Sequence, residues 1–169
     1  EYASIRFKKP VVLVGTKDNP IQLEGIWHSQ EEIRIQGPYT GRGTLVSDKG
    51  IIVTGDLEPA GKSESHLLAL VALEGAVEVL RSGQTKIKAG IYAREGLRGS
   101  KNGGVRLHGN LAVENLNRDQ MPRVFECRFN PHLKNHTADN LFGSISRRVL
   151  SFRILSDQHE SKASRRTSL

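Results

Sequence analysis

A five-residue pattern of aliphatic and variable positions, ending in glycine, recurs along the chain. It reads aliphatic, any residue, aliphatic, any residue, glycine, and it occurs at residues 21–25, 33–37, 51–55, 71–75 and 105–109. Alternation with a period of two is typical of a β-strand with one face in a core. Because glycine lacks a Cβ, the backbone can bend sharply where each strand ends. The pattern predicts short strands joined by glycine corners.

The spacing of these patterns predicts how the strands stack. Ile35 and Val53 are 18 residues apart, and Val53 and Leu73 are 20 residues apart. Such a period fits three short strands and three corners in each coil of a β-solenoid. We therefore predict an all-β fold, a single-stranded right-handed β-solenoid (β-helix) of about 4–6 coils with a C-terminal capping segment.

Two intervals depart from this period. Leu73 and Leu107 are 34 residues apart, which leaves room for an additional coil with strands at 85–89 and 91–93. Ile21 and Ile33 are only 12 residues apart, which indicates an irregular N-terminal coil or a cap, as expected for the terminal repeats of a solenoid.

The predicted organisation has four parts. They are N-terminal cap or opening strands at 1–20, the solenoid body at 21–115, a C-terminal capping segment at 116–156, and a disordered basic tail at 157–169. The alternation predicts interior positions at Ile21, Leu23, Ile33, Ile35, Val53, Leu73, Val77, Val79, Leu107, Leu111 and Val113.

The segment 64–80 has a competing interpretation as a helix. Ser65 could cap it, and the spacing of Leu67, Leu70 and Val77 partly fits a helical period. Gly75 would lie inside that helix, at a cost of about 1 kcal/mol relative to alanine. The valines and the position of this glycine favour a strand, a corner and a second strand.

Composition limits the chemistry without identifying it. The 169 residues fit one domain, the formal charge is +7, and the lone Cys127 is expected to be a buried or semi-buried thiol rather than a nucleophile. No apolar run is long enough to cross a bilayer. Most of the excess charge lies near the C-terminus, where residues 147–169 carry five Arg and one Lys against Asp157 and Glu160. We expect that tail to be solvated.

Three runs of sequence resemble a known family. They are Gly25–Ser29, Ile33–Val46 and Ile51–Leu57, supported by Leu68–Ala72, Phe129–Leu133 and Val149–Phe152. Together they resemble the β-solenoid ectodomains of bacterial pilin-like pilus assembly proteins of the PilX and ComZ types. The pilin helix and its processing site are absent, and Lys134–Thr137 replaces an expected proline-rich turn. Bactofilins share the glycine rhythm but usually keep a stricter, shorter period.

The resemblance implies an extracytoplasmic, cell-surface location and other pilus or surface subunits as partners. Membrane attachment would be only through an N-terminal anchor that this sequence does not contain. The implied role is non-enzymatic, with a rigid face presented to a partner or a surface.

Few residues form a motif that carries chemistry, and we predict no catalytic residue, no cofactor and no metal site. His132, His136 and Asp139 have a spacing that zinc could use, but Pro131 and the turn residues around it argue against the helix required. A polysaccharide-acting β-helix enzyme is an alternative that needs carboxylates converging in a groove. By spacing, its candidates are Asp48, Asp56 and Glu58.

DNA binding, as in uptake systems, is the second alternative. It would use a ladder of outward-facing cations, which is sufficient for contacts with phosphates. The candidate contacts to DNA or another polyanion are Lys86, Lys88, Arg94, Arg98, Lys101 and Arg106.

Overall fold

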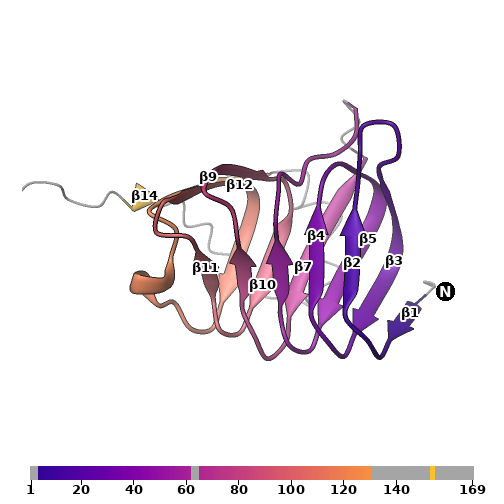
Figure 1. The fold of residues 1–169 in the computed structure, drawn as a ribbon, viewed down its shortest axis with the longest axis horizontal. Helices are drawn as coiled ribbons and strands as arrows, with labels where there is room; N and C mark the ends of the chain where they lie inside the picture. The colour runs from indigo at the N-terminus through magenta and orange to yellow at the C-terminus, as the bar shows by residue number, and fades with distance from the viewer. Residues whose placement is uncertain (1–3, 62–64, 131–152, 155–169) are drawn as a thin grey trace, which may run out of the picture.

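The computed structural model describes residues 4–61, 65–130 and 153–154. Within them the chain forms an all-β parallel β-solenoid of about 6 turns (Figure 1). The single helical element in this part of the chain is a short 3₁₀ turn, η1 (Arg118–Gln120). The predicted all-β solenoid is therefore confirmed.

One sheet has five strands and forms the face nearest the viewer in Figure 1, here called the front face. Its order is β11 (Leu97–Gly99), β8 (Val77–Val79), β6 (Ile51–Val53), β4 (Ile33–Gln36) and β2 (Val11–Val14). Its neighbouring strands pair in parallel, as successive turns of one solenoid must.

The second sheet supplies the other two faces. Its order is β1 (Ser4–Phe7), β3 (Ile21–Ser29), β5 (Tyr39–Ser47), β7 (Leu67–Ala72), β10 (Gly90–Ala93), β12 (Gly103–Val113), β13 (Val124–Phe129) and β14 (Arg153–Ile154), and β9 (Gly83–Ile87) also pairs with β12. Only the β13–β14 pair is antiparallel in the described part of the chain.

The long strands β3, β5 and β12 run over both of these faces. Their first halves, with β9 and β13, form a top face, which closes the upper side of the molecule in Figure 1. Their second halves, with β1, β7 and β10, form a back face. Gly25, with a φ of 71°, lies where β3 passes from one face to the other. One turn of the chain around the core is called a rung below.

Aliphatic side chains from successive rungs stack in columns inside the solenoid. On the back face the register aligns Ile5, Trp27, Leu45, Leu70, Ile91 and Leu111. On the front face it aligns Val11, Ile33, Ile51, Val77 and Leu97. The middle members of both columns are buried, so the core is a continuous aliphatic stack.

The segment that could have been a helix consists of strands. β7 and β8 flank a corner that contains Gly75, so the helical interpretation is wrong. The additional coil predicted between Leu73 and Leu107 is present as β9 and β10.

The prediction that Leu73 is interior is wrong, because its side chain is 42% exposed. The inward residues of β7 are Leu68, Leu70 and Ala72, so Leu73 lies just beyond the strand and out of phase with them. A shift of one residue moves a side chain to the opposite face of a strand. Leu111 and Val113, also predicted as interior, are half-buried in the last rung of the back face, and the remaining predicted core positions are buried.

The C-terminal end of the core is covered by residues that follow β12. Met121 and Phe125 are buried and belong to the core cluster. Pro122 packs against Gly99, where a Cβ would lie 2.8 Å from the proline ring. The described part of the C-terminal segment thus shields the last rungs from solvent.

Candidate partner-binding site

Among the described residues, the first rung, formed by β1 and β2, is the outermost one at the opposite end of the core. Ile5 occupies the inward column of the back face, yet it is 42% exposed. Leu45 and Leu70 occupy the same column in later rungs and are 1% and 0% exposed. Since the residues of one column differ mainly in how many rungs cover them, Ile5 is exposed because no described rung lies outside it.

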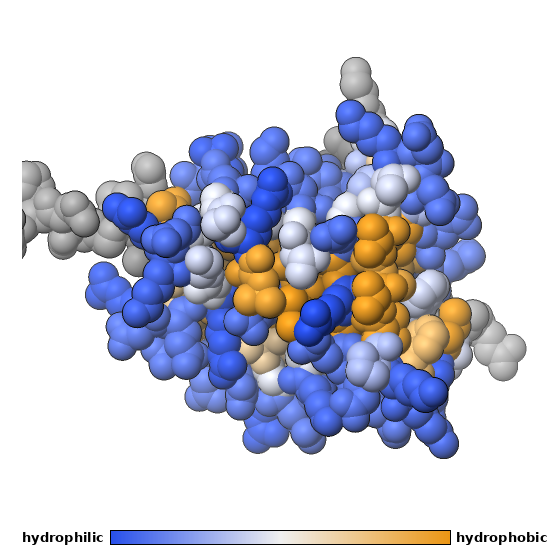
Figure 2. All heavy atoms as spheres, in the orientation of Figure 1, coloured by the Kyte–Doolittle hydropathy of each residue, from blue (hydrophilic) through white to orange (hydrophobic). Residues whose placement is uncertain are grey.

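β2 is an edge strand with apolar side chains on both of its faces. Val11 and Leu13 point inward and are half-buried, while Val12 and Val14 point outward and are 65% and 54% exposed. Figure 2 shows apolar side chains gathered over β2 at one end of the front face. An exposed apolar edge strand is a template to which another chain can add a strand.

The same end of the molecule is positively charged. Residues 4–20 contain Arg6, Lys8, Lys9 and Lys17 but only one carboxylate, that of Asp18. All five side chains are exposed. Positive charge beside an edge strand discourages pairing between identical copies, while it favours a partner of opposite charge.

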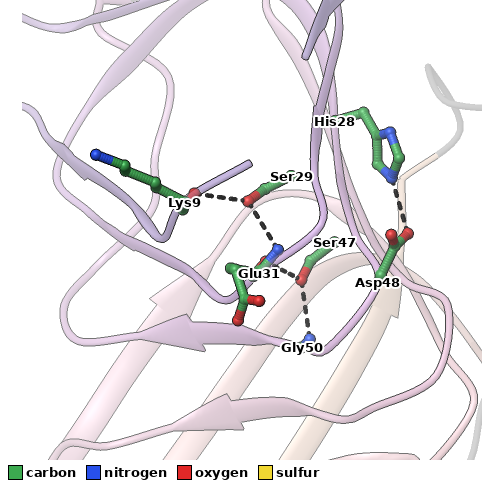
Figure 3. Close-up of polar contacts among 7 residues, drawn as sticks. All are labelled: Lys9, His28, Ser29, Glu31, Ser47, Asp48 and Gly50. Atoms are coloured by element: carbon green, nitrogen blue, oxygen red, sulfur yellow. Dashed lines mark hydrogen bonds and ion pairs between the residues drawn. The ribbon is translucent and has the colours of Figure 1, made fainter. Parts of the chain in front are cut away.

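Buried serines fix the corner between the back and front faces (Figure 3). The Ser29 hydroxyl donates to the carbonyl oxygen of Lys9 (3.1 Å), and the Ser47 hydroxyl donates to that of Glu31 (2.8 Å). The same serine oxygens accept from the N–H groups of Glu31 and Gly50. Both serines are fully buried, and each donates its hydroxyl to the corner of the preceding rung. The corner of the first rung, at Lys9, is therefore held in place by Ser29 of the second rung.

The six cations predicted to bind a polyanion are distributed around the solenoid rather than gathered on one face. Lys86 and Arg106 are register partners on the top face. Arg98 lies on β11 of the front face, and Lys88, Arg94 and Lys101 lie in turns between strands.

Three of these six cations are paired with carboxylates. Arg94 lies 3.5 Å from Glu114, Arg98 lies 2.8 Å from Glu95, and Arg106 lies 3.3 Å from Glu126. The predicted ladder is therefore reduced to the neighbouring pair Lys86 and Arg106, one of which already has an anionic partner.

An open groove of about 630 Å³ crosses the corner between the front and top faces. It is lined by residues from three successive rungs, including Lys17, Gln36, Asp56 and Glu58. Asp56 accepts hydrogen bonds from Arg81 (3.1 Å) and from the backbone N–H of Lys86 (2.9 Å). Two of the three predicted carboxylates thus line one groove, but Asp56 is engaged in holding neighbouring rungs together.

The third carboxylate lies elsewhere. Asp48 contacts His28 at 2.7 Å, in the neighbourhood of the serine-fastened corner (Figure 3). Cys127 is half-buried, and burial raises the pKa of its thiol, as expected for a thiol that is not a nucleophile. The candidate zinc residues His132, His136 and Asp139 lie outside the described residues, and the described ones contain no group of three metal-binding side chains.

Comparison of the chain with protein-family models, curated proteins and solved structures gives no match. No helix in the described residues is long and apolar enough to cross a membrane. The fold and its exposed features are therefore the basis for a proposal about function.

The open end was not singled out from the sequence. Its signals were present, since Val11–Val14 is apolar at both inward and outward positions and cations lie on either side of it. These signals indicate a contact surface only once β2 is known to be the edge strand of its sheet.

Proposed function

We propose that this chain is a non-enzymatic, extracytoplasmic β-solenoid domain of a pilin-like assembly or surface protein, and that it contacts a partner subunit through its first rung. The single observation that carries this proposal is the exposure of Ile5, a core position, beside the exposed edge strand β2. The resemblance to pilin-like ectodomains supports the location and the kind of partner.

Partner contact is favoured over DNA binding and over polysaccharide hydrolysis, because each of these needs side chains that are already engaged in this structure. DNA binding needs several cations available on one face, whereas Arg94, Arg98 and Arg106 are paired with carboxylates. Hydrolysis of a glycosidic bond needs two carboxyl groups on either side of that bond. Of the two that line the groove, Asp56 is already bound by Arg81 and by the Lys86 backbone.

The proposal predicts that charges placed on β2 will abolish partner binding while the fold persists. Val12 and Val14 are both more than half exposed, so V12K and V14K together should leave the core intact. Immobilised wild-type protein should retain a pilus or surface subunit from envelope extracts of the source organism, and the double variant should retain at least about tenfold less. Retained subunits are identified and quantified by mass spectrometry.

The control is L80K, which places one lysine, where the double variant places two, on a half-exposed leucine remote from the first rung. It should retain the subunit as wild type does. If V12K/V14K and L80K retain the same proteins in the same amounts, or if no pilus or surface subunit is retained, the proposed function is wrong.

A further inference from the structure

The corner between the back and front faces carries charges of alternating sign along its first four rungs. The second residue after the back-face strand is Lys9 after β1, Glu31 after β3, Lys49 after β5 and Glu74 after β7. The alternation ends there, because the same position is Glu95 after β10 and Asn115 after β12. The serine hydrogen bonds hold Lys9 and Glu31 in successive rungs of this corner. These four residues are called the corner ladder.

Neighbouring members of the ladder are close enough to pair. The Lys49 ammonium lies 2.8 Å from the Glu31 carboxylate, and this contact raises the pKa of Lys49. The geometry of this corner therefore allows an ion pair between ladder residues of adjacent rungs.

Among the described residues, Lys9 is the outermost member and has no carboxylate partner. Glu31, the nearest anion on the ladder, is occupied by Lys49. In Figure 3 the side chain of Lys9 extends away from the Glu31 carboxylate. A further rung added outside β1 and β2 would place its own ladder residue beside Lys9.

We infer that the partner segment bound at the first rung is an acidic strand–corner–strand unit whose carboxylate pairs with Lys9. This inference rests on the proposed function and specifies the chemistry of the occupant. Its two strands would add to β1 and β2, its inward apolar residues would cover Ile5 and Leu13, and its corner would carry an acidic residue. Such addition completes the edge by backbone hydrogen bonds, while the charge sets register and partner choice.

A second copy bound end to end through its own first rung fits less well. It would bring another Arg6, Lys8, Lys9 and Lys17 against the same four cations, and like charges at an interface oppose association. An acidic rung would both cover the exposed apolar residues of the first rung and provide an anion for its cations.

The chain contains a suitable probe in its own second rung. Residues 26–36 comprise one back-face strand, a corner with Glu31 at the ladder position, and one front-face strand. A fluorescein-labelled synthetic peptide of these residues can be titrated with the whole protein and followed by fluorescence anisotropy. A scrambled peptide of the same composition is the control for sequence.

We expect the peptide to bind wild-type protein and the scrambled peptide not to bind. K9E should weaken binding at least about fivefold, because it replaces an attractive contact by a repulsive one. A peptide carrying E31K should bind wild type weakly and regain its affinity with K9E. K17E is the matched control, since it changes the same charge in the turn after β2, outside the ladder, and should bind the original peptide nearly as wild type does.

The outcomes separate this inference from the function on which it rests. Binding that V12K/V14K abolishes but that the charge at Lys9 does not affect would overturn the acidic corner and leave strand addition intact. Equal effects of K9E and K17E would also overturn it, since they would reflect total charge alone. If neither peptide binds any of these proteins, the inference is wrong. The proposed function is tested separately, by whether the immobilised protein retains a pilus or surface subunit.

Discussion

Replacing Leu70 by aspartate is expected to abolish cooperative unfolding of the solenoid. Leu70 is fully buried between Leu45 and Ile91 in the back-face column. A carboxylate there has no partner and no access to water, which costs several kcal/mol, of the order of the whole stability of a domain this size. The measurement is urea unfolding followed by circular dichroism.

L73D is the matched control for L70D. Leu73 lies three residues later but is 42% exposed beyond the end of β7. Its replacement should change the free energy of unfolding by no more than about 0.5 kcal/mol. If L70D unfolds at the same urea concentration as wild type, or if L73D is the more damaging change, the assignment of the inward column is wrong.

Adding a single methyl group at Gly75 is expected to be nearly as harmful. A Cβ at this position would lie 1.5 Å from the carbonyl oxygen of Lys49 in the preceding rung. No side-chain rotation can relieve a contact between a Cβ and backbone, so the two rungs would have to separate locally. We expect G75A to lower the free energy of unfolding by about 3 kcal/mol, the upper part of the range for overpacking.

G104A tests whether this effect is steric. A Cβ at Gly104 would have its nearest contacts at 3.6 Å, from Val124, which is an ordinary van der Waals distance. Alanine should be tolerated there, and both variants can be compared by urea unfolding. If G75A and G104A lose the same stability, the close contact between stacked corners is not the reason that glycine is required at position 75.

The type of fold could be predicted because the alternation and the glycines have direct physical causes. Gly109 shows why the glycines recur, since a Cβ there would lie 1.8 Å from the carbonyl oxygen of Ala89 in the adjacent rung. Short alternating stretches separated by such glycines fit the repeated bends of a solenoid, although β3 and β12 continue through Gly25 and Gly109. The additional coil at β9 and β10 followed from spacing alone.

The face on which each repeated pattern lies could not be predicted. The patterns at 33–37 and 51–55 lie on the front face, those at 21–25 and 105–109 on the top face, and the one at 71–75 at the corner that follows the back face. All three corners favour the same pattern, because each needs an apolar strand followed by a tight bend. Alignment of Leu73 with Val53 was wrong for this reason, since the register pairs Val53 with Val79.

The cations could be identified from the sequence, but their arrangement could not. A rung turns around the core, so residues less than one rung apart can lie on different faces, as Lys86 on the top face and Arg98 on the front face do. Their carboxylate partners come from the same turn or from the next rung. The pairing of Arg106 with Glu126 required the register between β12 and β13.

The measurement that tests the open first rung most directly is amide hydrogen exchange, recorded for the isolated protein and in the presence of the peptide of residues 26–36. For the isolated protein we expect rapid exchange in β1 and β2 and strong protection in β6 and β7, which have neighbouring strands on both sides. Addition of the peptide should slow exchange in β2 and leave exchange in β6 unchanged. If β2 is already as protected as β6 in the isolated protein, the first rung is not an open edge, and the proposed contact surface does not exist.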